Sequence, residues 1–107
     1  MKIEVLYFEG CPNHGPVVDR LKAVLRQAGL PAEVSEIEVR DESAAKRLKF
    51  VGSPTIRVNG LDIEIDSRNV EETGFACRRY PGGVPPEEMI WAALREAGVI
   101  KDAPGND

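Results

Sequence analysis

Residues 2–8, KIEVLYF, constrain the fold most tightly, because they form a near-continuous run of β-branched, aliphatic and aromatic side chains. A strand that is buried on both faces has this composition, since neither face needs polar residues. The run ends at residues 9–16, a loop dense in turn-forming residues. The segment therefore predicts a strand covered on both sides, followed by a sharp change of chain direction.

The next elements are predicted from the spacing of apolar residues. One face of a helix is formed by Val17, Val18, Leu21, Val24, Leu25 and Ala28. This helix should end at Gly29, with Pro31 two residues later. A second strand is expected over residues 33–39, with an acidic edge that includes Glu36, and a short helix capped by Asp41 or Ser43 should follow it.

A β-hairpin is predicted around Asn59-Gly60, a type I′ turn signal. Ile56 and Val58 alternate with a polar residue before the turn, and alternation continues after it to about Asp66. An irregular stretch over residues 67–86 and a helix over about residues 86–97 complete the chain. The first two strands, joined by a helix, should be parallel.

The predicted order is β-α-β-α-β-β-α, which places helices on both faces of a four-stranded mixed sheet in an α/β fold. Residues 1–100 should form a single domain, and residues 101–107 a short polar tail. A chain of 107 residues can bury enough surface to fold without a metal or a disulfide.

Composition excludes several classes of function. The net charge of −4 does not suit sequence-independent nucleic-acid binding, which needs a positive face. No apolar run is long enough to cross a membrane or to form the core of a signal peptide, so a cytoplasmic location is expected. Two cysteines are too few for a secreted disulfide scaffold, and in a reducing compartment they indicate chemistry, metal binding or packing.

Three motifs occur at informative points of this topology: Cys11-Pro12-Asn13 after the first strand, Ser53-Pro54-Thr55 before the third, and Cys77-Arg78 followed by a glycine pair. With the element order, they resemble the thioredoxin-like superfamily over about residues 2–97. Within it, they are similar to small bacterial and archaeal proteins, some of which are labelled alkylmercury lyase. The resemblance implies a thioredoxin-like fold and thiol chemistry.

Cys11 is the candidate nucleophile, because it lies where a strand ends and a helix begins. Helix N-termini favour anions, and the thiolate is the reactive form of cysteine. The usual second cysteine of the CxxC motif is replaced by His14, which could favour the thiolate, relay a proton or bind metal, or be a solvated loop residue. Pro16 cannot donate a backbone hydrogen bond, so the helix could begin only near Pro16.

The resemblance implies that Ser53–Pro54 is a cis peptide bond that faces Cys11 and presents backbone groups to a thiol substrate. On this basis Ser53, Pro54 and Thr55 are candidate substrate-binding residues. The alternative is that Ser53 or Thr55 satisfies backbone groups of its own loop.

Cys77 is the candidate resolving thiol. If the fourth strand returns to the Cys11 edge and ends near Asp66, the loop that includes Cys77 starts at that edge. Arg78 could then stabilise the thiolate or bind an anionic substrate such as glutathione. The alternatives are an unpaired loop cysteine and a solvated arginine.

Three functions follow from these residues. The favoured one is a thiol–disulfide oxidoreductase or thiol-exchange protein that acts on disulfide- or thiol-containing substrates without a cofactor or a resident metal. The second is a protein that binds a soft metal such as mercury through Cys11 and Cys77. The third is a non-catalytic module whose exposed sheet edge holds a partner, including a second copy in a homodimer.

Overall fold

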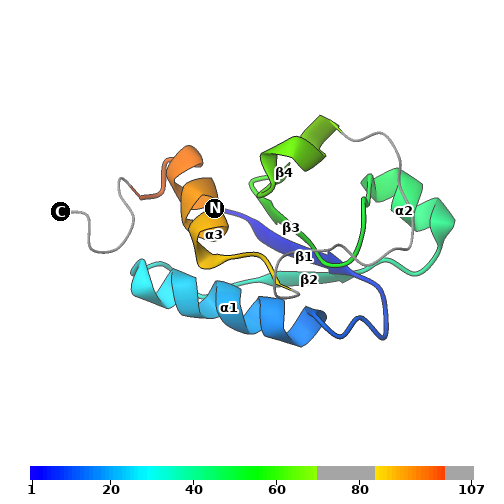
Figure 1. The fold of residues 1–107 in the computed structure, drawn as a ribbon, viewed down its shortest axis with the longest axis horizontal. Helices are drawn as coiled ribbons and strands as arrows, with labels where there is room; N and C mark the ends of the chain where they lie inside the picture. Colours follow the sequence, from blue (N-terminus) through cyan, green and yellow to red (C-terminus); the bar gives the residue numbers. More distant parts are fainter. Residues whose placement is uncertain (70–83, 101–107) are drawn as a thin grey trace.

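The computed structural model describes residues 1–69 and 84–100. Its architecture is a mixed four-stranded sheet with helices on both faces, compatible with a thioredoxin-like α/β fold (Figure 1). Within the described ranges, no helix is long and apolar enough to cross a membrane. Residues 70–83 and 101–107 are outside the description, so the expectations for Cys77, Arg78 and the polar tail are outside it as well.

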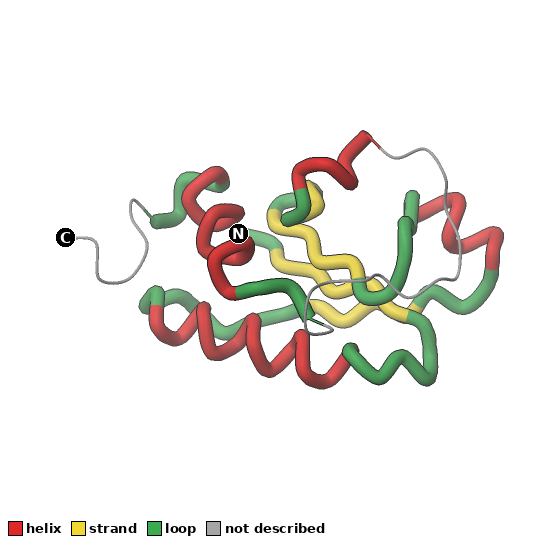
Figure 2. The backbone as a smooth tube through the Cα atoms, viewed as in Figure 1, coloured by secondary structure: helices red, strands yellow, loops and turns green. Residues whose placement is uncertain are grey.

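The sheet contains β1 (Ile3–Tyr7), β2 (Ser35–Glu38), β3 (Thr55–Val58) and β4 (Leu61–Asp62), in the spatial order β2-β1-β3-β4. β1 pairs in parallel with β2 and antiparallel with β3, and β3 pairs antiparallel with β4. The predicted mixed sheet is therefore confirmed, and β1 occupies an interior position as its composition requires (Figure 2).

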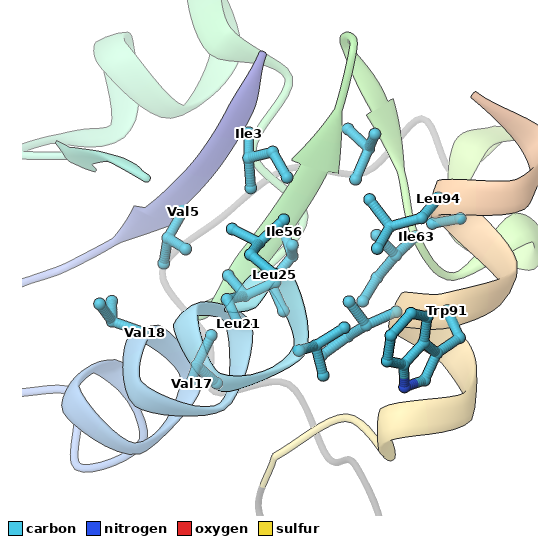
Figure 3. Close-up of a cluster of buried hydrophobic side chains, with 14 residues drawn as sticks. Ile3, Val5, Val17, Val18, Leu21, Leu25, Ile56, Ile63, Trp91 and Leu94 are labelled. Atoms are coloured by element: carbon cyan, nitrogen blue, oxygen red, sulfur yellow. The ribbon is translucent and has the colours of Figure 1, made fainter. Parts of the chain in front are cut away.

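One face of the sheet is covered by α1 (His14–Gln27) and α3 (Glu87–Glu96). Fourteen buried side chains form a single cluster between these helices and the sheet (Figure 3). Its members are Ile3, Val5, Val17, Val18, Leu21, Val24, Leu25, Ile56, Val58, Ile63, Ile90, Trp91, Ala93 and Leu94. We call this set the large cluster. The predicted apolar face of α1 supplies much of it, because its residues recur at helical spacing.

The opposite face is covered by α2 (Glu42–Leu48). Its cluster contains five buried residues of the described ranges, Leu6, Val39, Ala44, Ala45 and Phe50. We call this set the small cluster. Asp41 caps α2, since its side chain accepts a hydrogen bond of 2.7 Å from the Ala44 N–H. Of the two predicted caps, Asp41 is therefore the one that the chain uses.

Two predicted strands are shorter in the structure. β2 covers Ser35–Glu38 rather than residues 33–39, and β4 ends at Asp62 rather than near residue 66. The Ile63 N–H still donates to the Ile56 carbonyl at 3.0 Å, but the Asp62 side chain then accepts from the Glu64 N–H at 2.9 Å. This local bond turns the chain away from the ladder. The 3₁₀-helix η1 (Ile65–Asn69) follows in place of the rest of the strand.

α1 begins at His14, so the prediction of a start near Pro16 is wrong. Asn13 already has helical dihedral angles (φ −95°, ψ −3°), and its carbonyl accepts from the Val17 N–H at 3.0 Å. Pro16 lies in the first turn, where N–H groups have no acceptor within the helix. Its missing donor therefore does not interrupt α1.

Candidate functional site

Cys11 lies in the turn that joins β1 to α1. Its N–H donates to the Phe8 carbonyl at 3.2 Å, and its carbonyl accepts from the His14 N–H at 3.3 Å. The residue is buried, with 9% of its surface exposed, and it belongs to neither apolar cluster. Cys11 is thus held by backbone hydrogen bonds shortly after the end of β1. Only a small part of its surface is exposed to solvent.

The Ser53–Pro54 peptide bond is cis, as the resemblance predicts. Ser53 is fully buried, and its Oγ accepts a hydrogen bond of 3.3 Å from the Phe8 N–H. The Thr55 hydroxyl donates to the Gly52 carbonyl at 2.6 Å. Both hydroxyls therefore bind backbone groups, which is the alternative role that the sequence left open. Phe8 bonds to Ser53 through its N–H and to Cys11 through its carbonyl, so it connects the cis-proline loop to the Cys11 turn.

His14 is the first residue of α1, and its ring has two defined contacts. It stacks on Tyr7 with 3.6 Å between ring centroids and 9° between planes, and its Nε2 lies 2.6 Å from Glu36 Oε1. The side chains of His14 and Glu36 are 25% and 42% exposed. The structure therefore excludes a fully solvated loop histidine and directs Nε2 towards the β2 edge.

Sequence reasoning missed Tyr7 and Glu36 as partners of His14. The parallel register pairs Glu36 with Val5, two residues before Tyr7 on the same strand. Residues two apart on a strand point to the same face, and so do directly paired residues. The expected parallel pairing of the first two strands could have indicated that Tyr7 and Glu36 share a face, but a one-residue change of register would have put them on opposite faces.

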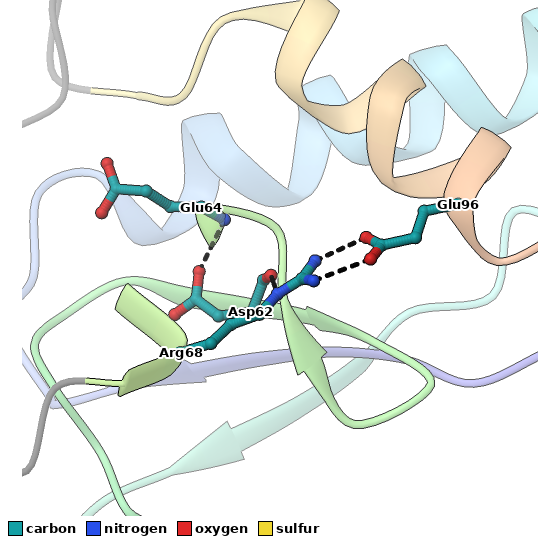
Figure 4. Close-up of polar contacts among 4 residues, drawn as sticks. All are labelled: Asp62, Glu64, Arg68 and Glu96. Atoms are coloured by element: carbon teal, nitrogen blue, oxygen red, sulfur yellow. Dashed lines mark hydrogen bonds and ion pairs between the residues drawn. The ribbon is translucent and has the colours of Figure 1, made fainter. Parts of the chain in front are cut away.

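The expected position of the loop that includes Cys77 relied on a long fourth strand, and that premise is wrong. After β4 the chain folds back in η1, where the Arg68 Nε donates to the Asp62 carbonyl at 2.8 Å (Figure 4). The topological reason for starting this loop at the Cys11 edge is therefore removed. Cys77 and Arg78 lie outside the described residues, so their roles stay predictions.

Arg68 also joins η1 to α3 through a bidentate ion pair. Its two terminal nitrogens lie 2.7 and 2.6 Å from the carboxylate oxygens of Glu96 (Figure 4). The hydrogen bond from Arg68 is the largest influence on Glu96 and lowers its pKa; burial opposes it, and the charge of Arg68 adds a smaller lowering. The same hydrogen bond raises the pKa of Arg68. This pair is remote in sequence from Cys11, and it connects η1, which follows the β3–β4 hairpin, to α3.

A shallow hollow of about 380 Å³ borders the Cys11 turn. It is lined by Phe8, Glu9, Glu38, Val39 and Arg40, and so lies at the carboxyl ends of the parallel strands β1 and β2. Ligands of open α/β sheets bind at this end of parallel strands. Two carboxylates and one guanidinium give the hollow an acidic balance.

Within residues 1–69 and 84–100, no group of three or more histidine, cysteine, aspartate or glutamate residues is arranged to hold a metal ion. The second cysteine that a two-thiol metal site would need, Cys77, lies outside these ranges. Metal binding by the two cysteines therefore stays a prediction.

A protein-family profile described as "Domain of unknown function (DUF2703)" matches residues 15–81, which is more than half of the chain. The match begins after Cys11 and includes the cis-proline loop and Cys77. No curated protein matches the chain. No solved structure matches it either.

Proposed function

Since the chain belongs to the DUF2703 family, whose function is not defined, we propose from its own residues that it is a thiol–disulfide oxidoreductase or thiol-exchange protein with Cys11 as nucleophile. One observation supports this most: Phe8 bonds through its N–H to Ser53 and through its carbonyl to Cys11. A cysteine turn beside a cis-proline loop is the arrangement that the resemblance to thioredoxin-like proteins implies for thiol exchange.

The start of α1 lies close to Cys11 and has no acidic side chain of its own. α1 begins three residues after Cys11, and its N-cap residue, Asn13, makes no side-chain capping bond. The first turn of α1 contains no acidic residue. The positive end of the helix dipole is therefore not neutralised by a side chain of that turn, and such an end stabilises a nearby negative charge.

The proposed reaction conserves atoms and electrons in two exchange steps. The Cys11 thiolate attacks one sulfur of a substrate disulfide, forming a mixed disulfide and expelling the other sulfur as a thiolate. A second thiolate, from Cys77 or an external thiol such as glutathione, attacks the Cys11 sulfur and releases the remaining substrate thiolate. The two thiols that are oxidised to the new disulfide supply the two electrons that reduce the substrate, and further glutathione then reduces this disulfide, forming glutathione disulfide and returning Cys11 to its thiol.

The decisive experiment compares Cys11→Ser with Cys77→Ser in the full chain. The purified proteins are supplied with a model disulfide, 5,5′-dithiobis(2-nitrobenzoate), and with glutathione as reductant. We expect Cys11→Ser to reduce turnover to the uncatalysed rate, because a hydroxyl cannot replace the thiolate as nucleophile. Turnover that survives this substitution would remove the proposal.

Cys77→Ser identifies the resolving thiol. If glutathione resolves the mixed disulfide, this variant keeps its turnover. If Cys77 resolves it, the variant accumulates a Cys11–substrate adduct that intact-mass measurement detects. Iodoacetamide provides a separate check, since the native protein should be alkylated at Cys11 near neutral pH despite the small exposed fraction of the residue.

A further inference from the structure

A second hollow, of about 350 Å³, lies on the α2 side of the sheet, between the carboxyl end of α2, the β3–β4 hairpin and η1. Among the described residues, four cations line it, namely Arg47, Lys49, Arg57 and Arg68. Asp62 is the one carboxylate among its described lining residues. We call this site the basic hollow. Its charge is unexpected in a chain with a net charge of −4.

The four cations differ in how far their charge is already compensated. Arg68 is paired with Glu96, and the Asp62 side chain accepts a bond from the Glu64 backbone. Within the described part of the chain, no ion pair joins Arg47, Lys49 or Arg57 to a carboxylate. Three of the four cations therefore form no described ion pair, and Asp62, which lies opposite Arg57 in the β3–β4 ladder, is the one described carboxylate beside them.

Arg57 is held in place before any ligand arrives. Its Nη2 donates to the Leu48 carbonyl at 2.7 Å and to the Lys49 carbonyl at 3.0 Å, at the end of α2. A guanidinium carries five N–H donors, and these two bonds use only the donors of one terminal nitrogen. The remaining donors have a fixed position, which lowers the entropic cost of binding an oxyanion.

The rest of the lining is partly apolar, with Leu48, Val51 and Leu61 beside the cations. Leu61 is 48% exposed, one of the few large apolar side chains of the described residues that face solvent to this extent. The volume lies at the lower end of the range for small-molecule sites, which combine apolar walls with a few polar groups.

We propose that the basic hollow binds a small organic oxyanion, a phosphate or carboxylate joined to an apolar group. Arg47, Lys49 and Arg57 bind the charged oxygens, and Leu48, Val51 and Leu61 contact the apolar part. The site is separate from the thiol chemistry, because it shares no described lining residue with the hollow beside the Cys11 turn. The proposal does not depend on the proposed function.

The test is a calorimetric titration of the full chain with four probes: 1-naphthyl phosphate, 1-naphthoate, uncharged 1-naphthol and inorganic phosphate. The naphthyl oxyanions should bind more tightly than either naphthol or inorganic phosphate, since only they satisfy both kinds of lining. Tighter binding of the phosphate or of the carboxylate then identifies the oxyanion that the hollow prefers.

The double variant Arg47→Gln/Lys49→Gln should weaken binding of the tighter naphthyl oxyanion by about tenfold or more, because each lost cation removes a charge-assisted hydrogen bond. Lys46→Gln is the matched control, since Lys46 is exposed on the last turn of the same helix and does not line the hollow. It should change affinity by less than about twofold. Arg47→Gln alone, which leaves the left-handed residue Lys49 in place, should show an intermediate loss.

Three results would overturn the proposal. The first is the absence of binding of either naphthyl oxyanion at about 10 mM, beyond the weakest affinity expected of a specific site. The second is naphthol binding as tightly as the oxyanions, which would show an apolar surface without charge recognition. The third is an equal loss of affinity in Lys46→Gln, which would show non-specific attraction to the surface charge of α2.

Discussion

The two faces of the sheet differ in how they are stabilised. The α1–α3 face buries the fourteen residues of the large cluster, whereas the α2 face buries the five residues of the small cluster among those described. Both larger described hollows border the α2 face: Phe8 and Val39 line one, and Leu48 lines the other. The difference indicates that one face supplies the stability of the fold, while the other leaves concave surface for binding.

The largest expected effect tests this division with two identical substitutions. Leu21→Ala, in the large cluster, should lower the free energy of unfolding by about 4 kcal/mol, because a fully buried side chain leaves a cavity that the surrounding core cannot fill. Leu6→Ala, in the small cluster, should cost about 2.5 kcal/mol, because the thinner layer can relax into the space. Urea unfolding measures both. An equal or larger loss for Leu6→Ala would contradict the division.

The next effect concerns the polar bond that anchors the Cys11 turn. Ser53→Ala removes the acceptor of the Phe8 N–H and should cost about 1 kcal/mol of stability. It should also raise the rate of alkylation of Cys11, because Phe8 bonds directly to the Cys11 turn.

Thr55→Val is the matched control for this loop. It removes the bond to the Gly52 carbonyl, and we expect a similar stability cost with an unchanged alkylation rate. Equal alkylation rates in the two variants would show that Ser53 does not control access to Cys11.

A smaller loss of stability is expected when Glu36, the ion-pair partner of His14, is substituted. Glu36→Gln weakens the contact between Nε2 and the carboxylate, and the half-exposed pair should contribute about 0.5 kcal/mol. Glu33→Gln, at an exposed glutamate just before the same strand, should change stability less. A loss above about 2 kcal/mol for Glu36→Gln would mean that the large-cluster face depends on this polar contact as well as on apolar burial.

The elements that could be predicted are those with a dominant local cause. The composition of β1 predicted its burial on both sides, and Asn59-Gly60 predicted the hairpin turn, where both residues have positive φ (52° and 84°). The end of β4 could not be predicted. The alternation of apolar and polar residues continues to Ile65 and favours a longer strand, but the Asp62 side chain accepts a hydrogen bond from the Glu64 N–H and turns the backbone away. Ile65 consequently is 64% exposed in η1 rather than paired in a strand.

The candidate site was predictable to a different degree. The positions of Cys11 and of the cis-proline loop followed from topology and from the resemblance. The contacts of His14 with Tyr7 and Glu36 depend on the register between two strands that are separated by a whole helix. A contact of this kind is set by tertiary packing, and a single sequence specifies it only through the complete fold.

The smallest effect should come from the Arg68–Glu96 pair. Because Arg68 lowers the pKa of Glu96 in the folded protein, the carboxylate stabilises the fold at pH values above its pKa in the unfolded chain, about 4.3. This stabilisation is lost as the pH falls through the lower pKa of the folded state. The difference in unfolding free energy between the wild type and Glu96→Gln should therefore be largest near neutral pH and shrink towards pH 3, as urea unfolding across this range measures.

High salt should reduce the same difference at neutral pH, since the Glu96 side chain is 43% exposed and its charge is screened. A difference that stays constant from pH 7 to pH 3 would show that Glu96 contributes through packing and not through its charge. If instead Glu96→Gln destabilises the protein as much as Leu21→Ala does, apolar burial is not what stabilises the α1–α3 face of the sheet. The association of α3 with the sheet would then depend on one ion pair, and the contrast between the two faces would have to be abandoned.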